Sequence, residues 1–423
     1  MPDFVHSVYL DADECKGCIN CIKRCPTGAI RVRGGKAHII KEFCIDCGEC
    51  VRVCPHHAKR TRYDSLDSMK EFKYKVALPA PSFYAQFNNI TDTSIILNAL
   101  LRLGFDDVFE VAAAAEMVSE LSRKYIAEHP EGKPFISTAC PSVVRLIRVR
   151  FPSLIERLLP ITTPADLAAS LAVKEAMKKT GLKREDIGVF FISPCPAKIT
   201  AVNNPLGIDK SEIDRVLAIK KVYTKMLPLM KTEDAGDSEL KRAGRIGISW
   251  GKSGGEVGGL LTDSYIAVDG IENVIRVLED LEDSKINHLD FVELNSCIGG
   301  CVGGVLQVEN PYVAKTKLTL LRKYMPVAGS HLDGNIPDNV YWNKEVEFVP
   351  VFRLGSTTLE SMEMMQKIDE LTEQLPGLDC GSCGAPTCRA LAEDIVRGVA
   401  TQRDCIHLLK KYLHQISSDL NSL

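Results

Sequence analysis

Residues 15–26 of the chain read CKGCINCIKRCP, and residues 44–55, 29 positions further on, read CIDCGECVRVCP. Both stretches have the spacing C-x2-C-x2-C-x3-C-P. Three closely spaced thiolates can bind one face of an iron–sulfur cube, while the cysteine before proline lies beyond a turn. Zinc sites and disulfide frameworks rarely repeat this spacing twice. The two stretches therefore predict two [4Fe–4S] clusters.

The repeated spacing is the signature of the bacterial two-cluster ferredoxins, in which the fourth cysteine of each run binds the cluster of the other run. The first cluster is therefore expected on Cys15, Cys18, Cys21 and Cys54. The second is expected on Cys44, Cys47, Cys50 and Cys25. We expect residues 1–72 to form a small α+β ferredoxin-like domain.

Length and charge narrow the class of protein. A chain of 423 residues is long enough for about three domains. Its formal net charge of −3 gives no basic patch that would attract nucleic acid or an anionic membrane. Cysteines in C-x2-C spacing, without a secretory leader or an apolar run of about 18 residues, favour a reducing compartment. We expect a cytoplasmic protein with no nucleic-acid partner and no membrane insertion.

After a charged connector at residues 60–75, strand-like and helix-like segments alternate, which predicts an α/β core that begins near residue 73. Amphipathic helical stretches separate most of the short β-rich runs. These runs lie at residues 74–79, 134–137, 188–192, 245–249 and 291–294.

Three of the β-rich runs lead into peptides that contain cysteine: FISTACP at 135–141, FISPCP at 191–196 and ELNSCIGGC at 293–301. Ligands gather at the carboxyl ends of parallel strands. A lone buried cysteine is commonly a small hydrophobe. Here each cysteine stands near proline or glycine, where backbone amides can approach a cluster. We expect four thiols to converge on one cofactor: Cys140, Cys195, Cys297 and Cys301.

The three peptides resemble the active-site signatures of the [FeFe]-hydrogenases, T-S-C-C-P, M-P-C-x-x-K-x-x-E and E-x-M-A-C-x-x-G-C-x-x-G-G-G. The likeness runs from about residue 73 to 354 and implies an α/β H-cluster domain at residues 73–355, with two lobes of parallel-rich sheets flanked by helices. It implies that Cys140, Cys195, Cys297 and Cys301 hold a [4Fe–4S] cube. Cys301 would also bridge to a diiron subcluster that bears CO, cyanide and an azadithiolate.

Two further segments fit this resemblance. Lys198 matches the signature lysine that contacts a cyanide ligand, and an ammonium group suits that role because it donates hydrogen bonds and carries positive charge. Residues 250–259, WGKSGGEVGG, look like the family's glycine-rich segment near the active site. A phosphate-binding P-loop is not expected, because that motif needs four residues between its first glycine and the Gly-Lys-Ser, and here there are three.

The chain departs from the family pattern at proton-handling positions. Ala139 stands where catalytic members carry the thiol that passes protons to the azadithiolate, and Ala201 replaces the glutamate of the second signature. General acid–base groups typically contribute about 10²- to 10⁴-fold. Turnover should therefore be slow unless water or other residues substitute. Glu116 and Glu120 are available on a preceding helical stretch, but we expect both to be solvated helix carboxylates.

Two methionines of the signatures are also replaced, by Ser193 and Asn295. A hydroxyl or amide can hydrogen-bond cluster ligands and so alter the redox potential. Drift in a decaying enzyme is a second interpretation of these changes. The retained cysteines and Lys198 argue against it.

A third cysteine pattern lies near the end of the chain, where residues 375–388 read LPGLDCGSCGAPTC. With the later Cys405 it predicts another [4Fe–4S] cluster, on Cys380, Cys383, Cys388 and Cys405, although four thiolates also suit zinc. It resembles a small cluster domain of electron-transport subunits and sensory hydrogenases. We expect a helical iron–sulfur domain at residues 356–423, with a helix at 389–397. The amphipathic stretch 406–416 is expected to pack on this domain, or otherwise on a partner.

Together these features predict a slow, sensory [FeFe]-hydrogenase, close to the class called group D, that reacts reversibly with H2 (H2 ⇌ 2H⁺ + 2e⁻). Four [4Fe–4S] clusters would carry electrons to a redox or signalling protein partner, and maturation proteins would install the diiron unit. The alternatives are a metabolic hydrogenase with a different proton path, or an iron–sulfur electron-transfer or scaffold protein without the diiron site. The oligomeric state is open, with a homodimer among the options.

Overall fold

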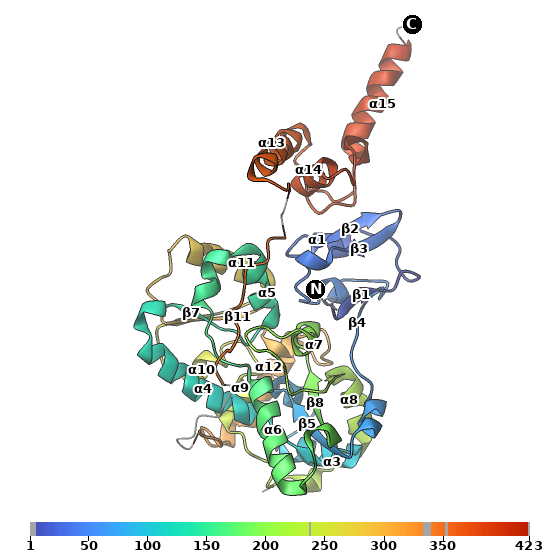
Figure 1. Cartoon of the computed structure of the whole chain (residues 1–423). Helices are drawn as coiled ribbons and strands as arrows, with labels where there is room; N and C mark the ends of the chain where they lie inside the picture. The colour runs from blue at the N-terminus through green and yellow to red at the C-terminus, as the bar shows by residue number, and fades with distance from the viewer. Residues whose placement is uncertain (1–5, 237, 333–339, 352–353, 422–423) are drawn as a thin grey trace. The chain divides into compact units, whose positions relative to one another are not determined.

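The computed structural model describes residues 6–236, 238–332, 340–351 and 354–421 (Figure 1). The chain divides into two compact units. Unit 1 comprises residues 1–7, 45–48 and 62–348, and unit 2 comprises residues 8–44, 49–61 and 349–423. The domain boundaries near residues 72 and 355 stay a prediction. Residues 1–5, on which the expected lack of a leader partly depends, lie outside the described residues.

The first sheet of unit 1 has four parallel strands in the order β6-β5-β8-β9. The central strand β8 is buried along its whole length, as expected for a continuous apolar run covered by helices on both faces. Alternate residues of β5 point to different cores: Leu78 packs with helix α6, and Ala77 packs with helices α3 and α8. The strands are β5 (Tyr74–Pro79), β6 (Asp107–Val108), β8 (Ile187–Ser193) and β9 (Arg215–Ala218). The helices are α3 (Ser94–Leu103), α4 (Val111–Glu128), α6 (Pro164–Thr180) and α8 (Ile219–Met226).

The second sheet of unit 1 has three parallel strands in the order β10-β11-β7. Its strands are β7 (Phe135–Ile136), β10 (Tyr265–Asp269) and β11 (Phe291–Asn295), and its core is shared with α5 (Pro141–Arg150) and α11 (Ile271–Glu282). The remaining helices of this unit are α7 (Pro196–Asn203), α9 (Arg245–Ser249), α10 (Val257–Leu260) and α12 (Pro311–Leu321). The expected two-lobed α/β class is thus confirmed, with strands at four of the five expected runs.

The prediction of a strand at residues 245–249 is wrong, because these residues form helix α9. Two amides at the start of this helix, those of Gly244 and Gly247, donate to the buried carboxylate of Glu116 at 2.9 and 3.0 Å. A side chain added at Gly247 would lie 2.1 Å from the Ala112 carbonyl oxygen, so α9 and α4 are in close backbone contact. These tertiary contacts override the short alternating pattern.

Unit 2 contains the ferredoxin-like segment and the C-terminal segment. The ferredoxin-like segment pairs β1 (Val8–Leu10) with β4 (Lys59–Thr61) and β2 (Ile30–Arg33) with β3 (Lys36–Ile39), both antiparallel, and adds helices α1 (Asn20–Lys23) and α2 (Glu49–Arg52). The C-terminal segment is helical, with α13 (Thr358–Gln374), α14 (Cys388–Val396) and α15 (Ile406–Asn421). The α+β and helical classes are therefore confirmed, as is a helix close to 389–397.

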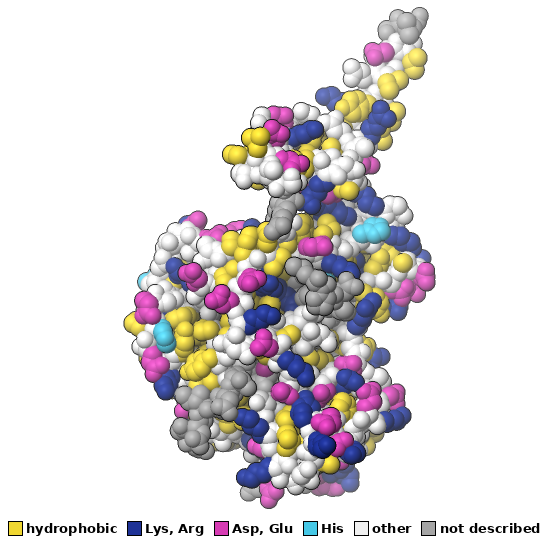
Figure 2. Space-filling view, in the orientation of Figure 1, with side chains coloured by type: hydrophobic (Ala, Val, Ile, Leu, Met, Phe, Trp, Pro, Cys, Tyr) yellow, Lys and Arg dark blue, Asp and Glu magenta, His cyan; other side chains and the backbone are white. Residues whose placement is uncertain are grey.

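Helix α15 does not pack as the sequence led us to expect. Figure 2 shows hydrophobic side chains interspersed with basic ones along this exposed helix, and Leu413 is 58 % exposed. The apolar core of the C-terminal segment includes Cys405 and Leu408 but none of the later described residues of α15. In the described part of the chain, no helix is both long and apolar enough to cross a membrane.

Candidate metal centres

Cys140, Cys195, Cys297 and Cys301 follow the carboxyl ends of parallel strands of unit 1. Cys140 and Cys195 directly precede helices α5 and α7, and Pro141 and Pro196 take the first helical positions, where a missing N–H costs little. The loop after β11 carries Cys297 and Cys301.

The thiols of these cysteines are close together. The Ser296 hydroxyl lies 3.6 Å from the Cys140 sulfur and 3.9 Å from the Cys297 sulfur. Burial raises the pKa of Cys195 to about 12 against the effect of Lys198, and the neighbouring Cys301 and Cys140 thiols add to the rise. Buried thiolates need a compensating charge, which a bound metal supplies. The donor set thus fits an iron–sulfur cube.

A small cavity adjoins the cysteines and is lined by Cys301 but by none of the other three. Its wall is largely apolar, with Phe191 and Trp250 among the lining side chains. The polar lining groups are few and are aimed at one space, which is typical of a cofactor site. They belong to Ser82, Lys198, Glu256, Glu293 and Asn295, and the Ala139 methyl group is also part of the wall. The cavity therefore fits a small diiron group attached through Cys301.

Lys198 lies on the first turn of α7, and its Nζ donates to the Ala139 carbonyl at 3.0 Å. Burial disfavours the ammonium form, but the thiolates of Cys301, Cys195 and Cys140 outweigh this effect and raise the pKa of Lys198. The lysine is therefore a charged donor at the cavity wall, not a solvated surface residue.

Two buried carboxylates at the cavity were not singled out from the sequence. Burial, together with the neighbouring charge of Glu293, raises the pKa of Glu256 to about 8, and burial also raises the pKa of Glu293. Glu256 accepts a hydrogen bond of 2.6 Å from Ser137, whose hydroxyl in turn accepts the Ala139 N–H at 3.3 Å. A chain of hydrogen bonds therefore runs from Glu256 to the backbone of Ala139.

Glu293 is held in place by hydrogen bonds from the glycine-rich segment. It accepts the N–H groups of Gly254 and Val257 at 2.8 and 3.0 Å and the Asn295 amide at 2.9 Å. The sequence signal for both carboxylates was their position: Glu293 interrupts an apolar strand, and Glu256 lies between glycines. Fully buried glutamates are rare unless they are paired or functional.

Ser193 and Ala201 are not among the residues that line the cavity beside Cys301. Ser193 directs its hydroxyl to the Cys195 backbone, donating to the carbonyl at 3.2 Å and accepting the N–H at 3.4 Å, so it stabilises the turn that carries this thiol. Ala201 lines a separate cavity together with Asp166. Of the substituted positions, only Ala139 and Asn295 line the cavity beside Cys301.

Glu116 is not the solvated carboxylate that we expected. It is 4 % exposed, and besides the two amides at the start of α9 it accepts the N–H groups of Gly329 and Ser330 at 2.8 and 2.9 Å. Glu120 is half-buried and accepts the Leu332 N–H at 3.3 Å. Both carboxylates hold loops against α4 and do not line the cavity.

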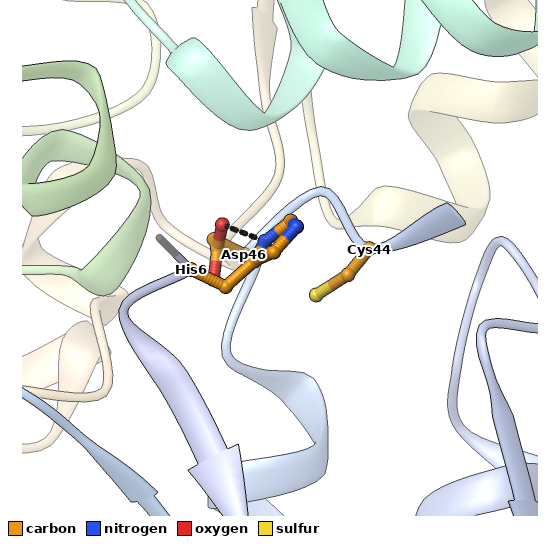
Figure 3. A group of neighbouring side chains, drawn as sticks. All are labelled: His6, Cys44 and Asp46. Atoms are coloured by element: carbon orange, nitrogen blue, oxygen red, sulfur yellow. Dashed lines mark hydrogen bonds and ion pairs between the residues drawn. The ribbon is translucent and has the colours of Figure 1, made fainter. Parts of the chain in front are cut away.

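The segment of residues 45–48 belongs to unit 1 and carries Cys47. Ile45 is buried in the core beneath α5. Asp46 is buried, with its carboxylate 2.7 Å from His6 Nδ1 (Figure 3) and 3.8 Å from Arg145 of α5. A side chain at Gly48 would meet Val305 at 2.8 Å and Pro196 at 3.3 Å. This segment is therefore fixed close to the peptides that carry Cys140 and Cys195.

Two sets of cysteines lie within unit 2. Burial raises the pKa of Cys21 in spite of Lys59, and the charges of Cys18, Cys54 and Cys15 add to the rise, so Cys54 lies near the first run of cysteines. The four C-terminal cysteines line one small cavity. Each set offers four neighbouring thiols, which fits a cluster or another tetrathiolate metal site.

Comparisons with known families match all three parts of the chain. The family model described as "Iron only hydrogenase large subunit, C-terminal domain" matches residues 73–263 and 251–305, which together exceed half of the chain. A "4Fe-4S dicluster domain" model matches residues 7–55, and an Fe-S cluster model matches residues 375–407.

Among curated proteins, Iron hydrogenase 1 of Clostridium pasteurianum is 22% identical over 285 residues, 55% of this chain and 50% of that protein. The periplasmic [Fe] hydrogenase large subunit of Nitratidesulfovibrio vulgaris is 25% identical over 377 residues, 74% of this chain and 89% of that protein. The chain therefore spans half the length of one relative and most of the other.

Two solved structures of the [FeFe]-hydrogenase of Chlamydomonas reinhardtii match with TM-scores of 0.45 and 0.46, at 15% and 14% identity, over 59% of this chain and 84% of theirs. The family-model match over residues 73–305 covers Lys198, the cavity beside Cys301 and four cysteines, which are Cys140, Cys195, Cys297 and Cys301. The chain belongs to the family of the C-terminal domain of iron-only hydrogenase large subunits.

Proposed function

We propose that the protein is a slow [FeFe]-hydrogenase that reacts reversibly with H2 and reports H2 to a redox or signalling partner. One observation carries the proposal: a cavity with Cys301 and Lys198 in its wall lies beside a group of cysteines from three distant peptides. A bound diiron group would supply the polarisation of H2 there.

The proposed ligands of the adjoining [4Fe–4S] cube are Cys140, Cys195, Cys297 and Cys301. Of these, Cys301 alone among the described cysteines lines the cavity, which favours it as the bridge to the diiron group. Lys198 would donate to a terminal cyanide, because its ammonium group is charged and faces the same space. The apolar remainder of the wall limits water at the site.

Protons need a route other than the family thiol, because the side chain of Ala139 has no exchangeable proton. Glu256 is the proposed acceptor, since it lines the cavity and its pKa of about 8 lies near neutral pH, where a carboxyl group can both take up and release a proton. Ser137 orients this carboxylate through its hydrogen bond. A carboxylate displaced from the thiol position is consistent with slow turnover.

Electrons would leave through the ferredoxin-like clusters. The segment that carries Cys47 is anchored through Asp46 to α5 and through Gly48 against Pro196. Both contacts are to the peptides that present the proposed ligands of the cube. We infer that the second ferredoxin-like cluster is the electron partner of the cube.

The test is exchange between D2 and water protons, followed by mass spectrometry on the matured protein. We expect slow formation of HD in the wild type and none in Lys198→Ala, which removes the proposed cyanide donor. No exchange by a wild-type protein with a full complement of iron would contradict the proposal and favour an electron-transfer or scaffold protein.

A further inference from the structure

The C-terminal segment of unit 2 contacts the ferredoxin-like segment through a buried ion pair. Arg31 Nε and Arg33 Nη2, both on β2, donate to the same Oδ2 atom of Asp394 at 2.8 and 2.7 Å. Asp394 lies on α14 and is 5 % exposed. Breaking a buried pair by removing one partner leaves an uncompensated charge and is strongly unfavourable. The contact therefore fixes α14 to β2.

The backbone beside the third cysteine pattern adds to this contact. The Val32 N–H donates to the Gly384 carbonyl at 2.8 Å, and Arg33 Nη1 donates to the Cys383 carbonyl at 2.6 Å. Gly384 has a φ of +82°, and a side chain there would lie 1.9 Å from the Val32 carbonyl oxygen. The peptide at residues 383–384 is therefore pressed against the strand, and the sequence keeps a glycine where this is required.

A third contact brings the two ligand-bearing loops together. A side chain at Gly381, which lies between Cys380 and Cys383, would be 3.4 Å from the Ile22 side chain. Ile22 directly follows Cys21 in α1. The next residue, Lys23, donates from its Nζ to the Asp379 carbonyl. The loops that carry the two sets of thiols thus meet through single side chains.

We propose that the cluster on Cys380, Cys383, Cys388 and Cys405 exchanges electrons directly with the ferredoxin-like cluster on Cys15, Cys18, Cys21 and Cys54. In this step one reduced [4Fe–4S]⁺ centre becomes [4Fe–4S]²⁺ and the other gains that electron, with no bond or proton changed. Arg33 is the positioning residue, because it joins Asp394 and the carbonyl of a ligand residue. The C-terminal cluster is then the terminal relay of the protein.

The charge of Arg33 should also affect the reduction potential of the C-terminal cluster. A guanidinium that donates to the carbonyl of Cys383 favours extra negative charge on the cluster bound there. The C-terminal cluster should therefore be easier to reduce than it would be without Arg33. Electrons that leave the ferredoxin-like clusters would be drawn to it.

The test uses the full chain with its [4Fe–4S] clusters reconstituted and without any diiron group, so that it does not depend on hydrogenase activity. Electron paramagnetic resonance spectra of the reduced protein report magnetic interaction between neighbouring clusters. The double variant Arg33→Gln with Asp394→Asn removes the charges of the ion pair between β2 and α14. Asp369→Asn is the matched control, because it breaks an exposed 2.8 Å pair with Arg389 inside the C-terminal segment.

We expect interaction signals in the wild type and in Asp369→Asn, and their loss in the double variant at equal iron content. We also expect a more negative reduction potential for one cluster in Arg33→Gln. A wild-type spectrum equal to the sum of isolated clusters would overturn the proposal, as would interaction that persists in the double variant. If the double variant loses iron, the single variant Arg33→Gln replaces it, and unchanged interaction and potential in that variant would equally overturn the proposal.

Discussion

Replacement of Glu256 by glutamine tests the proposed proton acceptor. Burial and the charge of Glu293 raise the pKa of this carboxyl group from its ordinary 4.5 to about 8. At about 1.4 kcal/mol per pH unit, ionising Glu256 in the folded protein costs roughly 5 kcal/mol. Glutamine has nearly the same shape as the protonated acid and can still accept the Ser137 hydrogen bond. The Glu256→Gln variant should therefore fold and retain the cavity.

The sign of the stability effect follows from the raised pKa. The folded protein holds a proton that the unfolded chain releases, so this contribution to stability is complete below about pH 4.5 and is lost as the pH rises through about 8. Glutamine does not titrate. Between pH 5.5 and 8.5, the variant should therefore gain about 3 kcal/mol relative to the wild type in its free energy of unfolding. Urea midpoints at the two pH values measure this difference.

Although Glu256→Gln should gain stability relative to the wild type as the pH rises, it should lose turnover. Loss of a positioned general acid–base group costs about 10²- to 10⁴-fold, so Glu256→Gln should lower the rate of H2 oxidation by an amount in this range. Glu120→Gln is the control, because Glu120 is a half-buried carboxylate that does not line the cavity. Equal pH trends in Glu256→Gln and the wild type, or unchanged turnover in Glu256→Gln, would refute the reasoning.

Three further predictions concern the metal centres. Ala139→Cys should raise H2 turnover, because it places a thiol at the cavity wall; an unchanged rate would show that proton delivery at this position is not limiting. Cys301→Ala should abolish the infrared bands of the diiron group while resonance signals of both ferredoxin-like clusters persist, and surviving bands would refute the proposed bridge. Gly384→Ala should weaken the contact between α14 and β2 by about 1–3 kcal/mol, because alanine is strained at a φ of +82°; faster proteolysis of the C-terminal segment measures this effect, and an unaltered rate would count against it.

The sequence predicted most of the fold because its strongest signals are local. Strands β5, β8 and β11 are apolar runs that end at defined peptides, and each run of cysteines has its own spacing. The helix at residues 245–249 could not be read locally, since it depends on the Glu116 carboxylate 128 and 131 residues away.

The sequence predicted the motif residues of the candidate site but not its two buried glutamates. The family motifs indicated Ala139, Lys198 and the cysteines, because each lies within a recognisable peptide. Glu256 and Glu293 emerged only from the folded chain, where burial makes two ordinary glutamates neighbours in one cavity. The ion pair between Arg31 and Asp394 joins residues 363 positions apart and has no signal in either local sequence.

The most direct measurement is infrared spectroscopy of the protein matured with a diiron precursor, recorded under argon and then under H2. We expect CO and cyanide bands that shift when H2 is added and that are absent from Cys301→Ala. A protein with all its iron–sulfur clusters but no such bands, or with bands that do not respond to H2, would contradict the claim that it is a hydrogenase.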